Sequence, residues 1–269
     1  MPLLLKPVPP NRGARWLTDG FRLYARRPLA FTLMFTAFLF AALVVSLVPL
    51  LGGVLQMMSL PLLSLGFMVA AQSALLDGPV SARQFIEPLR TDPARRRALL
   101  TLCALYGVLA IAILILCDAI SDGALERVQR LMASGSATPE DVNAVLMEPG
   151  VTNAALAALV LGTLLSIPFW HAPALVHWGA QGVAQALFSS TLAVWRSKGA
   201  FFVYGMAWAA TMVGFGMAAA LVFGLLGLAP LGTMLALPAG LLFWTVFYVS
   251  LLFTFNDSFG DAGRRGANA

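Results

Sequence analysis

The sequence predicts an all-α membrane protein, a six-helix transmembrane bundle with two cytoplasmic interfacial elbow helices and a short helical outer loop. The first observation behind this prediction is composition, since 59% of the 269 residues are hydrophobic and only 11% are charged. A soluble domain carries about 25% charged residues. The second is that the apolar residues fall in runs of 20 or more, the length that crosses about 30 Å of hydrocarbon as a helix.

The apolar runs are expected to be helices because lipid cannot hydrogen-bond a bare backbone, and because they lack the alternating polarity of barrel strands. Short turns at Gly52-Gly53 and between Gly227 and Pro230 are expected to pair the first two spans and the last two. Residues 1–269 are then a single polytopic membrane domain. Its predicted spans are 29–51, 54–76, 98–117, 154–176, 201–226 and 231–255.

The basic residues predict the orientation, because lysine and arginine are retained on the cytoplasmic side. Fifteen of the 17 lie in the segment 1–28, in the loop before the third span, after the fourth span, or in the tail 256–269. The other side carries only Arg127 and Arg130. Both termini are therefore expected in the cytoplasm. The net charge of +5 is read as a membrane-orientation signal, and no nucleic-acid partner is expected.

The outer loop, 118–150, is expected to hold two short helices. The first is an amphipathic helix in 122–133, and the second starts at Thr138, a capping residue followed by proline and two acids. Two interpretations are open, a helical pair lying on the outer membrane surface and a lid or partner-docking element.

Two amphipathic segments, 12–27 and 181–198, are the predicted elbow helices. In the first, Leu17, Phe21 and Tyr24 share a face at helical spacing. Each elbow either only orients the span that follows it or also binds lipid or a partner protein. The basic side chains expected to meet anionic lipid headgroups are Arg12, Arg15, Arg22, Arg26, Arg196 and Lys198.

The two elbows also introduce segments that resemble each other, Tyr24 to Phe31 and Trp195 to Phe202. Each has an aromatic residue, basic residues, a helix breaker and a phenylalanine at the entry to a span, and the offset is 171 residues. Both would start on the cytoplasmic side, so the pattern indicates either a parallel internal repeat or a chance similarity.

The most polar part of the apolar sequence contains His171 and His177, beside Pro168 and Pro173, which are expected to bend or interrupt the fourth span. A proton or metal site is one interpretation. The other places the rings at the membrane boundary. Residues six apart lie about 240° apart around a helix, and no third ligand is nearby, so no metal and no cofactor is expected. Gln56 and Gln72 are further intramembrane candidates, as a polar site or as interhelical hydrogen bonders.

Small residues at four-residue spacing predict close helix packing in the second and fifth spans. Packing inside the bundle is the favoured use, and a homo-oligomer contact is the alternative. The residues are Gly66, Ala70 and Ala74 in the second span, and Ala210, Gly214, Ala218, Gly216, Ala220 and Gly224 in the fifth.

Three sequence segments resemble those of a family of uncharacterised bacterial multispan inner-membrane proteins. They are GFRLYARRPLAF from Gly20, LPLLSLGFM from Leu60, and HAPALVHWGAQGVAQALFSSTLAVWRSKGAFFVY from His171 to Tyr204. The likeness covers most of the chain outside 118–150. It implies a bacterial inner-membrane location and no assigned activity, so it transfers no catalytic residues.

The favoured function is that of a non-enzymatic envelope or assembly factor, which acts through membrane lipids with anionic headgroups or through a membrane-protein partner. A transporter or channel for a small or lipid-like molecule is the alternative. The third hypothesis is an intramembrane enzyme that uses His171 and His177. No catalytic motif is present in the sequence, so no catalytic residue is named.

Overall fold

The computed structural model describes residues 5–49, 51–90, 92–134 and 138–260. Six of its helical segments are long and apolar enough to cross a membrane. The predicted six-helix, all-α membrane fold is therefore confirmed. The elements are α1 (Arg12–Arg26), α2 (Pro28–Ser46), α3 (Leu51–Leu75), η1 (Ala82–Phe85), η2 (Glu87–Arg90), α4 (Pro93–Ile120), α5 (Ala124–Ser134), α6 (Pro139–Leu146), α7 (Pro149–Phe169), α8 (Ala172–Gly179), α9 (Val183–Arg196), α10 (Lys198–Leu225) and α11 (Ala229–Phe259).

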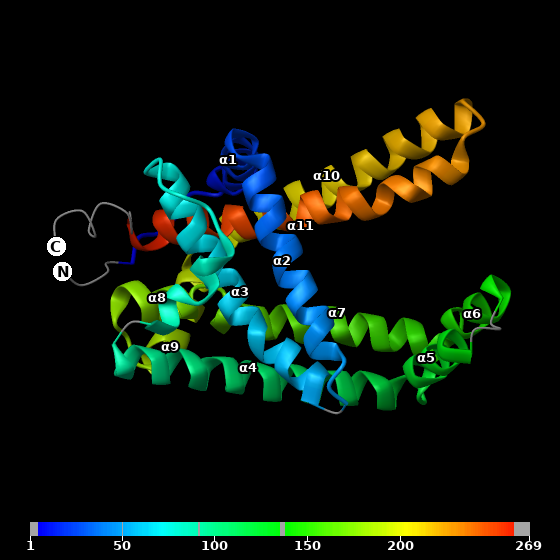
Figure 1. Cartoon of the computed structure of the whole chain (residues 1–269), viewed down its shortest axis with the longest axis horizontal. Helices are drawn as coiled ribbons and strands as arrows, with labels where there is room; N and C mark the ends of the chain where they lie inside the picture. The colour runs from blue at the N-terminus through cyan, green and yellow to red at the C-terminus, as the bar shows by residue number, and fades with distance from the viewer. Residues whose placement is uncertain (1–4, 50, 91, 135–137, 261–269) are drawn as a thin grey trace.

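The long helices pack together at one end, and at the other end the α10–α11 hairpin separates from α4 and α7 (Figure 1). The buried residues of α10 all lie in its first half, and those of α11 lie from Thr245 onward. The α10–α11 hairpin therefore leaves the rest of the molecule and extends away from it (Figure 1). The packed ends belong to the side that the sequence predicts to be cytoplasmic, where α1, α8 and α9 join the core.

Helix α1 lies against α10 and α11. Its buried face carries Gly13, Trp16, Leu17, Gly20 and Leu23. Two of these are glycines seven residues apart, so they share a face. A Cβ at the first would overlap the carbonyl oxygen of Ala200, and one at Gly20 would lie 2.7 Å from Cβ of Ser250. The glycines therefore let α1 approach α10 and α11 more closely than any larger residue would.

The first hairpin turn differs from the sequence prediction. Gly52 and Gly53 lie inside α3, and the chain turns at residues 47–49 instead. The prediction of a turn at the two glycines is wrong, because Pro49 fixes its own backbone and interrupts the helix first. Gly52 serves packing rather than turning, since a Cβ there would lie 2.6 Å from the carbonyl oxygen of Val45 in α2.

The segment predicted as the outer loop forms α5 and α6, close to the helices predicted for it. Thr138 caps α6 and exchanges hydrogen bonds with Asp141, which completes a capping box. These hydrogen bonds lower the pKa of Asp141. Arg127 of α5 pairs with Glu148, directly before α7. Whether the pair of helices lies on the membrane or acts as a lid stays a prediction.

Candidate functional site

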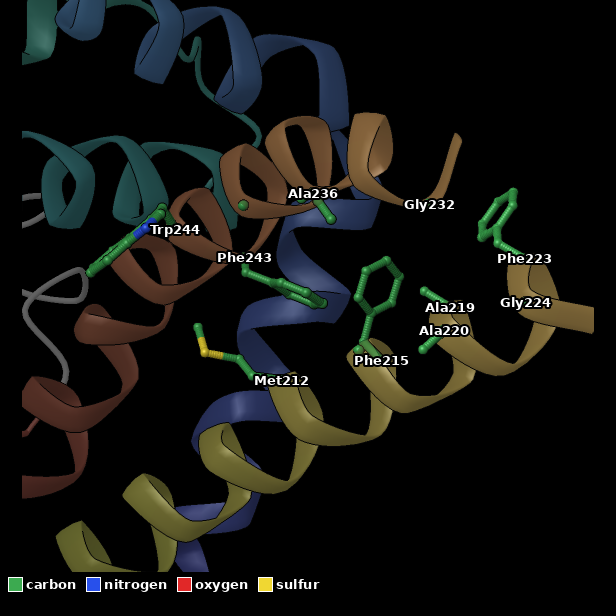
Figure 2. A pocket seen from close by; sticks show the side chains of 13 residues that line it. Met212, Phe215, Ala219, Ala220, Phe223, Gly224, Gly232, Ala236, Phe243 and Trp244 are labelled. Atoms are coloured by element: carbon green, nitrogen blue, oxygen red, sulfur yellow. The ribbon is translucent and has the colours of Figure 1, made fainter. Parts of the chain in front are cut away.

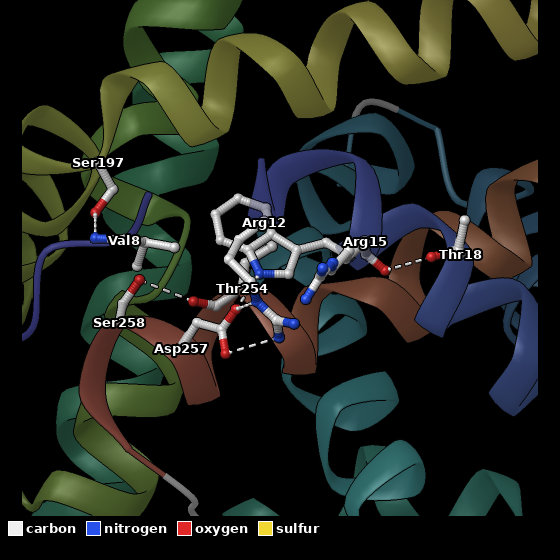
Figure 3. Close-up of polar contacts among 9 residues, drawn as sticks. Val8, Arg12, Arg15, Thr18, Ser197, Thr254, Asp257 and Ser258 are labelled. Atoms are coloured by element: carbon white, nitrogen blue, oxygen red, sulfur yellow. Dashed lines mark hydrogen bonds and ion pairs between the residues drawn. The ribbon is translucent and has the colours of Figure 1, made fainter. Parts of the chain in front are cut away.

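Helix α1 is bound to the C-terminal end of α11 by a cluster of charge-assisted hydrogen bonds around Asp257 (Figure 3). Arg12 donates from Nε to Oδ2 at 2.7 Å and from Nη2 to Oδ1 at 3.0 Å. Trp16 donates from Nε1 to Oδ2 at 2.7 Å. The hydrogen bond to Asp257 raises the pKa of Arg12. This cluster makes Arg12 part of the packing between α1 and α11.

The other predicted headgroup contacts remain on the surface. Arg15, Arg22 and Arg26 are exposed along α1, and among them Arg22 lies 3.5 Å from Asp19. Arg196 and Lys198 are exposed at the junction of α9 and α10. These five side chains are placed where anionic groups can reach them, whereas the position of Arg12 differs from the expectation because Asp257 already satisfies it.

The predicted break in the fourth span lies between α7 and α8, and a residue of α9 stabilises it. The hydroxyl of Ser190 accepts a hydrogen bond from the backbone nitrogen of His171 at 3.0 Å and donates to the carbonyl oxygen of Ile167 at 3.0 Å. Those two backbone groups are four residues apart and would bond each other in a continuous helix. Ser190 therefore stands in for the missing helical hydrogen bond.

We expect Ser190→Ala to lower the free energy of unfolding by about 2 kcal/mol, because the buried nitrogen of His171 and the part-buried carbonyl of Ile167 both lose their partner. Equilibrium unfolding in mixed micelles measures the change. Ser189→Ala, on the neighbouring residue, is the matched control and should stay within about 0.5 kcal/mol of wild type. Equal losses in the two variants would contradict the bridging role of Ser190.

The polar candidates within the predicted spans each have their own surroundings in the structure. His171 is fully buried, with Nε2 3.2 Å from the hydroxyl of Thr254 and with three phenylalanine rings around it. His177 packs beside Trp178. Gln56 donates to the carbonyl oxygen of Ala42 at 2.7 Å, and Gln72 is half-buried. In the described ranges, no cluster of three or more His, Cys, Asp or Glu side chains is arranged to hold a metal ion.

The predicted small-residue faces are used differently in the two spans. Gly66, Ala70 and Ala74 are buried, and a Cβ at Gly66 would overlap the ring of Phe85 in η1. The six residues of α10 differ from the expected bundle packing, because the hairpin extends away from the core and leaves them all exposed. Their use in a homo-oligomer stays a prediction.

Three large apolar grooves follow the separated helices. One, of about 630 Å³, lies between α10 and α11 and includes Met212, Phe243 and Trp244 in its lining (Figure 2). The second, of about 550 Å³, shares these three residues and continues over α7 towards Lys198. The third, of about 520 Å³, lies between α11 and the first hairpin and also includes Trp244. Among the described residues that line the three grooves, Lys198 is the single charged one.

Sequence reasoning did not find Asp257, Trp16 or Ser190 as structural partners. The predicted sixth span ended at residue 255, so Asp257 fell in the tail, whereas α11 continues to Phe259. The signal that would have found it is an acidic residue two positions beyond an apolar run, in a chain whose N-terminal segment is strongly basic. The tail from residue 261 onward, including Arg264 and Arg265, lies outside the described residues.

One relative covers almost the whole chain. It is a probable inner membrane protein of Burkholderia thailandensis, 32% identical over 255 residues that make up 94% of this chain and 93% of the relative. No protein-family model matches the chain, and no solved structure matches it. The resemblance to bacterial inner-membrane proteins is thereby confirmed. With its six apolar helices, the chain belongs to the same family of multi-pass inner-membrane proteins as this Burkholderia thailandensis protein.

Proposed function

We propose that this protein is a non-enzymatic envelope or assembly factor of the inner membrane, and that it works by binding lipid. Both termini lie in the cytoplasm in this proposal, as the distribution of basic residues favours. The observation that carries the proposal is the set of lateral grooves, whose walls are apolar side chains of α7, α10 and α11. Hydrocarbon chains match such walls, whereas polar solutes would lose their hydration there.

The exposed cations support the lipid interpretation. Arg15, Arg22 and Arg26 project from a helix whose opposite face is fixed on α10 and α11, so they are held at one end of the bundle. Basic side chains at a membrane surface attract anionic headgroups. The outward-facing Phe188 and Trp195 of α9 are 68% and 69% exposed, and aromatic rings of this kind favour the membrane–water interface.

We expect Arg15→Gln, Arg22→Gln and Arg26→Gln, combined, to reduce co-purifying anionic lipid more than tenfold. Each basic residue near an anionic surface contributes about 1 kcal/mol of attraction, or about fivefold in affinity. Native mass spectrometry with stepwise removal of detergent measures the lipid retained. The matched control replaces Arg83, Arg90 and Arg97, which are exposed in the loop around η1 and η2 and at the start of α4.

Retention of anionic lipid by the control but not by the α1 variant is the expected outcome. A wild-type protein that carries no lipid would count against the proposal. A co-purifying protein lost in the α1 variant, in place of lipid, would redirect it to a membrane-protein partner.

A carrier for a lipid-like molecule is the second candidate, because the α7–α8 break lies beside the groove at Trp170. Transbilayer movement of a fluorescent phospholipid in liposomes distinguishes the two functions. Accelerated movement relative to protein-free liposomes would favour the carrier, and an unchanged rate would favour static lipid binding.

A further inference from the structure

We infer that the groove between α7, α10 and α11 is a specific site for one phospholipid with an anionic headgroup, whose phosphate binds Lys198 and whose acyl chain lies along α10. This inference rests on the proposed lipid-binding function and names the lipid class and its position. The observations that carry it are the wall of the groove, its length, and the charge at its end.

The wall of the groove is mainly apolar beyond Lys198. Two of its aromatic polar groups are satisfied inside the protein, since Trp170 Nε1 donates to Thr254 at 3.2 Å and the Tyr204 hydroxyl meets Ser250 at 2.5 Å. Among the described residues, Nε1 of Trp208 is buried without a hydrogen-bond partner. The hydroxyl of Ser166 donates to a carbonyl oxygen of its own helix at 2.7 Å. The remaining ring and side-chain surfaces suit a hydrocarbon chain.

The length of the groove matches one leaflet. Its lining residues on α10 run from Lys198 to Met212, which is about 21 Å at the rise of an α-helix. One leaflet of hydrocarbon is about half of 30 Å thick, and the headgroup region adds the rest. A phospholipid seated here would have its headgroup at the first residue of α10 and its chain end near Met212.

The charge at the end of the groove is that of Lys198, which packs on an aromatic ring. Lys198 Nζ lies 5.2 Å from the ring centroid of Trp195, a cation–π contact that restricts the ammonium group. Among the described residues, no carboxylate forms an ion pair with Lys198 or with the neighbouring Arg196. Two cations without an acidic partner, beside an apolar groove, complement an anionic phosphate.

The chain offers matched variants for the groove. Gly205 lines it, and a Cβ there would meet no atom within 4 Å, so Gly205→Leu fills the groove without disturbing the helix. Gly214 is on the same helix, is equally open, and is absent from the groove lining. Gly214→Leu is therefore the control. For the charge, Lys198→Gln is paired with Lys6→Gln, which changes the other lysine of the chain.

The experiment reconstitutes each variant into vesicles of equal phosphatidylglycerol and phosphatidylethanolamine and measures the retained lipid by native mass spectrometry. We expect wild type, Gly214→Leu and Lys6→Gln to retain one phosphatidylglycerol. Gly205→Leu should retain at least tenfold less lipid, because displacing even two methylene groups has that effect. Lys198→Gln should lower the ratio of phosphatidylglycerol to phosphatidylethanolamine about fivefold.

Unchanged retention in Gly205→Leu, or an unchanged lipid ratio in Lys198→Gln, would overturn the inference. If those two variants behave like wild type and lipid is lost only when Arg15, Arg22 and Arg26 are replaced, the broader proposal of lipid binding would stand without this site. A wild-type protein that retains no lipid from these vesicles would overturn both.

Discussion

Leucine in place of Gly13 is expected to separate α1 from the bundle. A Cβ at this position overlaps the carbonyl oxygen of Ala200 and lies 2.7 Å from the backbone nitrogen of Tyr204. Backbone atoms of a long helix cannot move aside as a flexible side chain does. The free energy of unfolding should fall by about 3 kcal/mol or more, the upper end of the range for overpacked sites. Equilibrium unfolding in mixed micelles measures it.

The matched control for this change is Gly53→Leu. Gly53 is also helical, and a Cβ there meets no atom within 4 Å, so leucine should be neutral or slightly stabilising through its higher helix propensity. Proteolysis after Arg15 or Arg22 gives an independent readout, because released α1 should be cut faster. If Gly13→Leu unfolds at the same midpoint as Gly53→Leu, α1 does not contact α10 in the way described.

Alanine in place of Asp257 is expected to lower the free energy of unfolding by about 2–3 kcal/mol. The change removes the acceptor of two hydrogen bonds from Arg12 and one from Trp16. Hydrogen bonds to a charged group contribute about 1.5–3 kcal/mol, and the guanidinium of Arg12, whose side chain is 29% exposed, keeps its charge without a partner. Denaturation in mixed micelles, followed by tryptophan fluorescence, measures the loss.

Two further variants test the origin of that loss. Asp19→Ala removes a carboxylate of α1 that pairs with the exposed Arg22. This change should alter the free energy of unfolding by less than about 1 kcal/mol. Arg12→Gln combined with Asp257→Ala should cost less than the sum of the single changes, because the two groups lose the same interaction. Strict additivity would show that Arg12 and Asp257 do not stabilise each other.

The membrane fold could be predicted because its signal is composition and length, which do not depend on how the helices pack. The start of α4 is also determined by neighbouring residues alone. Asp92 accepts hydrogen bonds from the backbone nitrogens of Ala94 and Arg95 and precedes a proline. The turn at Gly52-Gly53 was predicted wrongly because glycine is compatible with both a turn and a close helix contact. Only the position of α2 shows which one applies.

The buried face of α1 could be predicted only in part from the sequence, for a related reason. Helical spacing picked out Leu17, Phe21 and Tyr24, which do pack towards α10 and α11. It did not find Gly13 and Trp16, which are buried on the same helix. A glycine adds nothing to an apolar pattern. Its contribution to packing depends on which residue, far away in the chain, lies against it. The acceptor for Trp16 is likewise 241 residues away, beyond the reach of any local pattern.

The last hairpin also has a consequence for the bilayer itself. Helices α10 and α11 contain 28 and 31 residues, about 42 and 46 Å, whereas α2 contains 19 residues, about 28 Å. Helices of such unequal length, joined at one end, cannot all match a hydrocarbon thickness of about 30 Å while standing upright. Such a hairpin fits the bilayer by tilting, by extending into the headgroup region, or by thickening the bilayer around it. This hydrophobic mismatch means that the protein deforms the membrane locally. The extent of the deformation depends on the acyl-chain length of the surrounding lipids.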